Sequence, residues 1–176
     1  AADGAESNDA DTLANKNFFL SVAFPDDEMN ILDYNRVVRD LNGLSAQQLA
    51  DGLAESFDVE PSNGAVKPEH PGVFGMYLDG QWYRLSIRAD RIPTDDPVGQ
   101  LDVSLLQDWI LAPLLGVGDP RLDPRVDFVG GIRGLDGLSA KVDCGDVAVA
   151  FSLYPTSMEQ LMAVADAEQL MPPKST

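Results

Sequence analysis

The feature that most constrains the fold is an apolar stretch near the end of the chain, residues 146–154. It is partly β-branched and too short for a buried helix, so it predicts a strand covered on both faces. Pro155 ends that strand because proline has no N–H for a ladder. Thr156 then predicts a helix start, with Glu159 in the capping-box position. This helix is expected to run to Pro172-Pro173 and to pack through Met158, Leu161, Met162, Ala165 and Leu170.

The remaining chain alternates between strand and helix patterns. Asp79-Gly80 between two apolar runs predicts a β-hairpin, which requires antiparallel pairing. The last two predicted strands flank a short helix, and such a unit favours a right-handed parallel crossover. The prediction is therefore an α+β protein, a single domain with a mixed sheet and about four helices, over residues 16–176 after a flexible lead-in at 1–15. Strands are predicted at 18–24, from 29 to 32, 73–78, 81–88 and 126–129, helices at 45–56, 102–115 and 135–142, and a loop at 60–72. Ser45 is expected to cap the first of these helices, with Gln48 in the capping-box position.

The composition excludes several classes of function. The net charge is −17, from 29 acidic and 12 basic residues, which argues against binding to nucleic acids or to anionic membrane surfaces. Any local basic cluster stands out against this background. The single cysteine excludes a disulfide framework and favours a cytoplasmic location. No apolar run reaches the length of about 18 residues that a membrane span needs.

Three short segments are candidates for binding an anion. Arg36 stands beside Asn35 and could hold an anion through its guanidinium fork. Gly130, Gly131 and Arg133 lie between a predicted strand and a predicted helix, where backbone N–H groups can face an anion. The third segment is Lys174-Ser175-Thr176. The simpler alternatives are an arginine paired with a surface acid, a tight strand-to-helix turn and a polar tail.

One specific hypothesis joins two of these segments. Lys174 and Arg133 would approach a common anion, with Gly130-Gly131 N–H groups and the Ser175 or Thr176 hydroxyl completing the shell. The two strands that precede them are expected to end on the same side of the sheet. A helix of about 13 residues would carry Lys174 about 20 Å away from that side unless the tail folds back.

Metal and catalytic signals are weak. Asp26, Asp27 and Glu28 could bind a hard cation such as Mg²⁺, although a solvated acidic turn is the simpler interpretation. His70 is the only histidine, and no nucleophile–base pair or metal-ligand cluster accompanies it. Catalytic residues and cofactors, including any nucleotide, therefore stay unassigned.

Several stretches resemble a bacterial domain-of-unknown-function family, numbered 1015, in the family's order and over nearly the whole chain. They are Asn17–Leu20, Phe24–Glu28, Tyr34–Val38, Phe128–Gly134, Pro155–Ser157 and Met171–Thr176. Two departures stand out: Asp3-Gly4 is not followed by the family's His-His-Arg, and the aromatic segment that normally follows Lys-Ser-Thr is missing. The resemblance therefore implies the C-terminal half of a longer protein.

The resemblance also implies a function. Family members are often associated with serine biosynthesis, and the missing His-His-Arg motif is similar to one in sulfiredoxin-like proteins, a group that includes free-serine kinases. A small phosphorylated or anionic metabolite such as serine or phosphoserine is therefore the expected partner, and the parent is expected to be a phosphotransferase or phosphatase-type enzyme. The chain alone is expected to be inactive. The alternative is a non-catalytic structural or regulatory module that supports the missing N-terminal half and contacts its segments.

Overall fold

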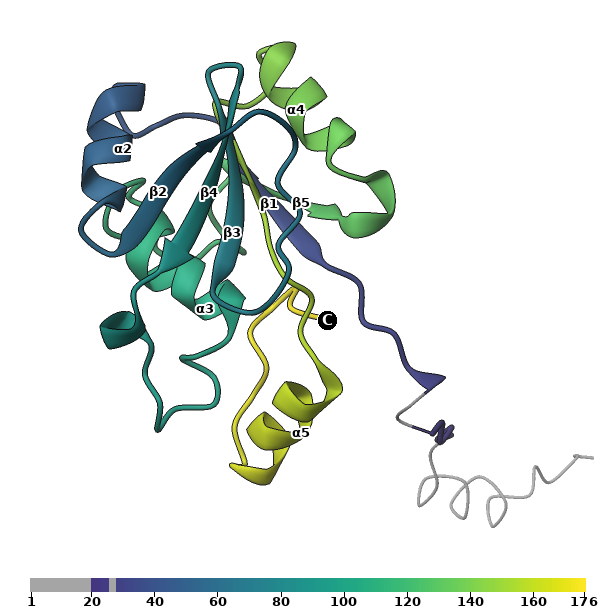
Figure 1. Cartoon of the computed structure of the whole chain (residues 1–176). Helices are drawn as coiled ribbons and strands as arrows, with labels where there is room; N and C mark the ends of the chain where they lie inside the picture. Colours follow the sequence, from purple (N-terminus) through teal and green to yellow (C-terminus); the bar gives the residue numbers. More distant parts are fainter. Residues whose placement is uncertain (1–19, 26–27) are drawn as a thin grey trace, which may run out of the picture. The chain divides into compact units, whose positions relative to one another are not determined.

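A computed structural model describes residues 20–25 and 28–176. Residues 31–176 form one compact unit, built on a six-stranded sheet (Figure 1). All neighbouring strands in this sheet are antiparallel. From one edge to the other, the strands are β2 (Phe57–Ser62), β4 (Gln81–Ile87), β3 (Val73–Leu78), β6 (Val149–Ser152), β1 (Tyr34–Val38) and β5 (Val126–Gly130).

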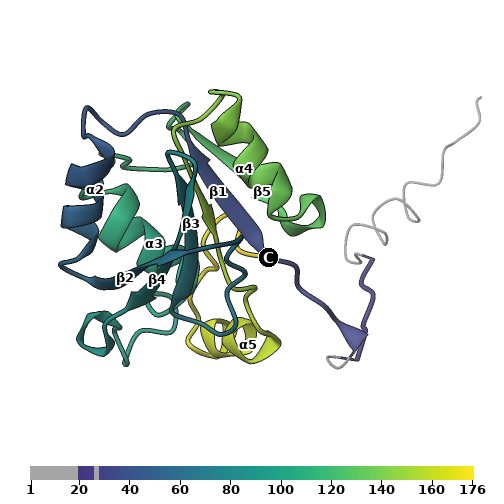
Figure 2. The same ribbon diagram turned by 45° about the horizontal axis from the view of Figure 1, so that its top comes forward.

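The described residues contain four α-helices, which confirms the predicted α+β class. Helices α2 and α3 cover one face of the sheet, α4 covers the other, and α5 lies beyond one end of the strands (Figure 2). A π-helical turn, η3, continues α3. The bounds are α2 (Ala46–Leu53), α3 (Asp102–Leu106), η3 (Gln107–Leu111), α4 (Asp136–Asp143) and α5 (Met158–Asp166), with short 3₁₀ turns η2 (Ala89–Arg91) and η4 (Gly131–Arg133).

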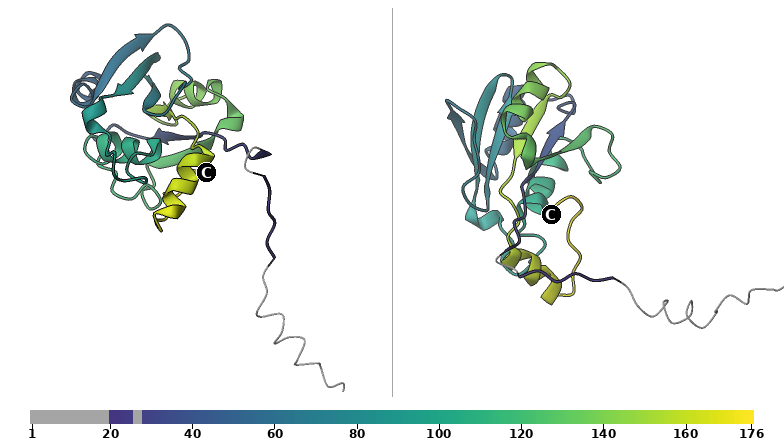
Figure 3. Two further views of the ribbon diagram at one scale, coloured as in Figure 1. Left: turned by 60° about the horizontal axis from the view of Figure 1, so that its bottom comes forward. Right: turned by 90° about the vertical axis from the view of Figure 1, so that its right-hand side faces the viewer.

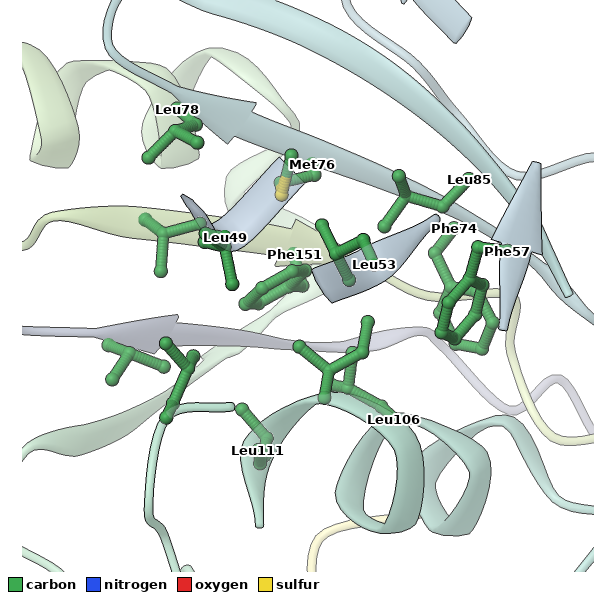
Figure 4. Packing of buried hydrophobic residues seen from close by; sticks show 14 of the residues in the cluster. Leu49, Leu53, Phe57, Phe74, Met76, Leu78, Leu85, Leu106, Leu111 and Phe151 are labelled. Atoms are coloured by element: carbon green, nitrogen blue, oxygen red, sulfur yellow. The ribbon is translucent and has the colours of Figure 1, made fainter. Parts of the chain in front are cut away.

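The core explains why the final strand is apolar at successive positions. Val149 and Phe151 of β6 pack with α2 and α3, as seen for Phe151 in Figure 4, whereas Ala150 belongs to the cluster on the α4 face. Alternate side chains of a strand point to opposite faces, so helices on both faces require apolar residues throughout. The predicted central position of this strand is confirmed, since β6 pairs with β3 on one side and β1 on the other.

Local signals in the sequence are confirmed where they depend on neighbouring residues. Asp79 and Gly80 form the two-residue turn between β3 and β4, and both have positive φ angles, 50° and 77°. That backbone matches the right-handed twist of the flanking strands. Ser45 caps α2 in a capping box with Gln48, as predicted.

The predicted parallel pairing of the last two strands is wrong. Strand β1 lies between β5 and β6 and is antiparallel to both. The crossover rule sets the handedness of the connection, but it does not prevent an earlier strand from filling the space between its two strands. Because β5 and β6 are each antiparallel to β1, their carboxyl ends still lie together, at the Tyr34 end of β1.

Three other strand assignments differ from the prediction. Strand β2 includes Pro61 and falls partly in the predicted loop; proline is tolerated there because β2 is an edge strand. Residues 20–25 adopt no regular secondary structure, so the described part of the predicted strand 18–24 is not a strand. The strand expected from Met29 begins only at Tyr34. The lead-in at residues 1–15 lies outside the described residues.

The C-terminal helix starts one residue later than predicted and ends earlier. Ser157, not Thr156, is its N-cap, in a capping box with Gln160. The Thr156 hydroxyl instead donates to the carbonyl of Ser175, at 2.8 Å. Leu170, which the sequence predicts to pack with the helix, is 89% exposed, because α5 ends at Asp166. None of the described helices combines the length and hydropathy needed to cross a bilayer.

Candidate functional site

Arg36 is a buried cation at the centre of the candidate site. It lies in β1 and is 4% exposed. Its guanidinium donates to the carbonyl of Tyr34 and, at 2.9 Å, to that of Lys174. Its Cζ lies 4.6 Å from the ring centroid of Phe128, the residue opposite it in β5. Carbonyl oxygens and an aromatic face stabilise the guanidinium without neutralising its charge.

The electrostatic environment of Arg36 is unusual for an arginine. Burial lowers its pKa to about 10, and the nearby Tyr34 opposes this shift. At neutral pH the group is still protonated, so a full positive charge is held in a poorly solvated position. Among the described residues, no carboxylate forms an ion pair with it. The simple alternative, an arginine paired with a surface acid, does not apply within the described chain.

The chain turns back after α5 (Figure 3), and its Lys174 carbonyl accepts a hydrogen bond from Arg36. The bond from Thr156 to Ser175 holds it, and the buried Ser175 hydroxyl donates to the carbonyl of Pro172 at 2.6 Å. Lys174 has a positive φ angle of 59°, and its Nζ lies 5.7 Å from the ring centroid of Tyr34. The fold-back therefore brings Lys174 close to Arg36, two candidate residues that are 138 positions apart.

A pocket of about 550 Å³ opens beside Arg36. Its walls come from the loop before α3, the α3–η3 helix, the Gly118–Arg121 loop and Pro172-Pro173 of the tail. Gln107 fixes one wall, because its Nε2 donates to the carbonyls of Val117 and Gly118 at 2.8 and 3.0 Å. The π-helical turn that contains Gln107 is a local feature often found at functional sites.

The pocket also contains charged residues that the sequence did not single out. Arg121 and Asp119 form an ion pair at 2.7 Å, and hydrogen bonds from Arg121 lower the pKa of Asp119 to about 2. Asp96 and Asp108 line the pocket as well, and neither forms an ion pair with a described residue. Both carboxylates are exposed, although partial desolvation and the charge of Asp96 raise the pKa of Asp108. Only the fold reveals this grouping, because the sequence places these residues in loops and on a helix surface.

The anion shell predicted around Gly130 and Gly131 is not formed as expected. The Gly131 N–H donates to the carbonyl of Asp33 at 2.8 Å, so it is already used. A Cβ at Gly131 would overlap the Asp33 carboxylate, so the space beside this glycine holds an acidic group. Gly130 pairs with Tyr34 in the sheet, whereas Arg133 is exposed and does not line the Arg36 pocket.

The predicted hydroxyl ligands are also placed differently. Ser175 uses its hydroxyl within the tail, and Thr176 is exposed. Of the predicted anion-binding residues, the structure therefore brings together Arg36 and Lys174, whereas Arg133 does not line the pocket beside Arg36. The Arg36 side chain shares a strand face with Tyr34, which explains why the tail, the two rings and the guanidinium meet there.

The weak metal and histidine candidates gain no support. Asp26 and Asp27 lie outside the described residues, and Glu28 is exposed. No group of three or more potential metal ligands occurs among the residues that the structure describes. His70 is exposed, with Nδ1 at 2.9 Å from the carbonyl of Pro71.

Asp102 is a buried acid that sequence reasoning missed. It is 7% exposed at the start of α3, and its Oδ1 accepts a hydrogen bond from the Gly72 N–H at 2.8 Å. Burial raises its pKa to about 7, while the N–H groups of Gly72 and Tyr154 and the charge of His70 oppose the shift. Asp102 does not line the Arg36 pocket. It ties the beginning of β3 to the helix that forms one pocket wall.

Comparisons with known proteins give one family and one set of similar folds. A family model described as "Protein of unknown function (DUF1015)" matches residues 2–104. The Lys174-Ser175-Thr176 segment lies outside this match. A search of curated proteins gives no match. Two structures of free serine kinase in complex with AMP, one of them a point mutant, resemble the chain with TM-scores of 0.47 and 0.46 at 12% and 10% identity. Each comparison covers 82% of this chain and 52% of the kinase chain, so this chain spans about half the length of those proteins.

Proposed function

This chain belongs to the DUF1015 family of proteins of unknown function, and we propose that it binds a small anionic metabolite in the pocket beside Arg36. The observation that carries the proposal is a buried guanidinium with no carboxylate partner among the described residues, placed in a pocket wall. A phosphate or carboxylate at this point would neutralise the buried charge and accept the remaining guanidinium donors in a fork geometry.

The pocket is of a suitable size for this role. Its volume of about 550 Å³ is within the range of sites for small metabolites. Its lining includes neither histidine nor cysteine, and its charged side chains are those of Arg36, Arg121 and three aspartates. Serine or phosphoserine as the ligand, and a phosphotransferase or phosphatase-type parent, are the finer parts of the proposal and come from the family resemblance. A cytoplasmic location likewise stays a prediction from the single cysteine.

A structural role is the second candidate, and one contact favours it specifically. The Arg36 guanidinium donates to the carbonyl of Lys174, so the buried cation could serve only to hold the tail against β1. In that case Arg36 would stabilise the module without binding any ligand, as expected for a non-catalytic support of a longer protein.

Calorimetry on the Arg36→Gln variant distinguishes the two functions. Titrated with inorganic phosphate and with phosphoserine, the wild-type chain is expected to bind, and the variant is expected to lose about 1–3 kcal/mol of binding free energy, the scale of a hydrogen bond to a charged group. Because glutamine is shorter than arginine and does not reach the Lys174 carbonyl as Arg36 does, urea denaturation of both proteins is measured alongside to show that the variant is folded. Arg133→Gln is the matched control and is expected to bind as the wild type does.

The opposite outcome would favour the structural role. Equal affinity in Arg36→Gln and wild type, or no binding of either compound to the wild type, would remove the proposed anion site. A lower free energy of unfolding in Arg36→Gln, measured with urea, would then identify Arg36 as a residue that holds the tail.

A further inference from the structure

The tail, residues 170–176, covers the guanidinium that the proposed site needs. Arg36 is 4% exposed, its Nη1 donates to the carbonyl of Tyr34, and its Nη2 donates to the carbonyl of Lys174 at 2.9 Å. An anion bound in a fork takes one N–H from each of two guanidinium nitrogens. The carbonyl oxygen of Lys174 therefore competes with an incoming anion for Arg36, and a guanidinium so deeply buried offers an anion little surface while the tail is in place.

Few bonds fasten the tail to the rest of the fold. The Thr156 hydroxyl donates to the carbonyl of Ser175 at 2.8 Å, and Arg36 donates to that of Lys174. Within the described chain, no backbone–backbone hydrogen bond joins the tail to another segment. The bond from the Ser175 hydroxyl to the carbonyl of Pro172 lies within the tail itself. A segment held in this way opens locally at a lower free energy than the sheet does.

The closed position of the tail also strains its backbone. Lys174 has a φ angle of 59°, in the left-handed region, where the Cβ of any residue but glycine is crowded against the backbone. Other residues hold such angles only where surrounding contacts require them, and these sites are frequent in ligand clamps and switch segments. The strain opposes the bonds from Thr156 and Arg36, so the tail is held less firmly than those bonds alone would hold it.

We propose that the tail is a gate on the anion site. With the tail closed, the carbonyl of Lys174 occupies Arg36; with it open, an anion takes the place of that carbonyl, and Pro172-Pro173 leaves the pocket wall. The inference rests on the proposed anion site and adds its regulation, since the apparent affinity for an anion is the intrinsic affinity multiplied by the fraction of molecules with an open tail. Thr156 sets this fraction, because its bond to Ser175 exists only in the closed state.

Thr156→Val tests the gate, because valine has nearly the shape of threonine but lacks the hydroxyl. The N-cap of α5 is Ser157, so the substitution leaves that cap in place. We expect the open fraction to rise about fivefold, the scale of one neutral hydrogen bond. The Arg36 Nε proton is then expected to exchange with water about fivefold faster, measured by NMR without any ligand, and inorganic phosphate is expected to bind about fivefold more tightly, measured by calorimetry.

Two further variants accompany this measurement. Thr156→Ser keeps the hydroxyl and is the matched control, with exchange and affinity expected within about twofold of the wild type. Ser175→Ala removes the bond to the carbonyl of Pro172 and loosens the tail at a second point, so both quantities are expected to rise here as well. Urea denaturation shows that each variant is folded. An increase in affinity distinguishes a gate from a supporting wall, because loss of a supporting wall weakens binding.

The outcomes separate the gate from the anion site itself. Weaker or unchanged phosphate binding in Thr156→Val, with faster exchange at Arg36, would overturn the gate and leave the anion site standing. Exchange at the wild-type rate in Thr156→Val would overturn the role given to Thr156 and the gate with it. If phosphate binds neither protein while exchange is faster in the variant, the proposed function falls together with the gate, and the tail is a structural cover of Arg36.

Discussion

Phe151→Ala is expected to lower the free energy of unfolding by about 3–5 kcal/mol, the cost of truncating a fully buried phenylalanine. Phe151 has no exposed surface and lies in β6, where it is paired with Met76 of β3 and Arg36 of β1. Its ring faces α2 and α3, so the alanine variant leaves a cavity between the sheet and those helices (Figure 4).

Urea denaturation measures this effect, with Leu122→Ala as the control. Leu122 is 80% exposed, and its truncation is expected to change stability by less than about 0.5 kcal/mol. A loss below about 1 kcal/mol for Phe151→Ala would contradict the central, doubly covered position of β6, since surface positions give changes of that size.

The stability of the chain is expected to fall as the pH rises from about 4 to about 7, through the titration of Asp102. Its pKa is raised from 3.8 to about 7 by burial. Over this interval the folded state holds a proton that the unfolded state has released, so raising the pH favours unfolding. A tenfold change in an ionisation constant corresponds to about 1.4 kcal/mol, so the lost stability reaches about 4 kcal/mol once the carboxyl is fully ionised.

The Asp102→Asn variant isolates this contribution. Asparagine keeps an acceptor for the Gly72 N–H but does not titrate. The free energy of unfolding of the variant is therefore expected to fall much less with rising pH than that of the wild type. The pKa values of Asp119, Asp123 and Glu159 are lowered by their hydrogen bonds, so these groups act in the opposite direction at lower pH. Urea denaturation of both proteins at pH 5, 6, 7 and 8 therefore compares how their free energies of unfolding change with pH. The same pH dependence in wild type and variant would show that Asp102 does not cause the decline.

The parts of the fold that the sequence predicts are those that adjacent residues determine. The Asp79-Gly80 turn needs only its own positive φ angles, and the α2 capping box needs only Ser45 and Gln48. The buried strand β6 is predictable because helices on both faces demand an apolar residue at each position. These features follow from local sterics, hydrogen bonding and hydrophobic pattern.

The strand order could not be predicted in the same way. Strand β1 separates β5 and β6 although it precedes β5 by about 90 residues and β6 by about 110, and nothing local to any of the three strands specifies that choice. The C-terminal helix shows a smaller version of the problem. Thr156 has the chemistry of an N-cap, but its hydroxyl donates to the distant Ser175 carbonyl, and Ser157 is the N-cap instead.

The candidate site depends almost entirely on such distant contacts. The sequence indicates Arg36 as a candidate, but the burial of this residue comes from Phe128 on the neighbouring strand and from the returning tail. Lys174 joins it only because the tail folds back. Gly131 has the expected position at a strand end, but its N–H donates to the Asp33 carbonyl, and neither Gly131 nor Arg133 lines the Arg36 pocket.

The central claim, that an anion meets Arg36 in this pocket, is tested most directly by NMR. In a chain labelled with ¹⁵N, a phosphate titration is expected to shift the Nε–Hε resonance of Arg36 and the amides of Gly118, Asp119 and Arg121, whose residues line the pocket. Resonances of Gly131 and Arg133 are expected to stay in place, since the Gly131 N–H is bonded to Asp33. Shifts confined to Gly131 and Arg133, with Arg36 unchanged, would contradict the account.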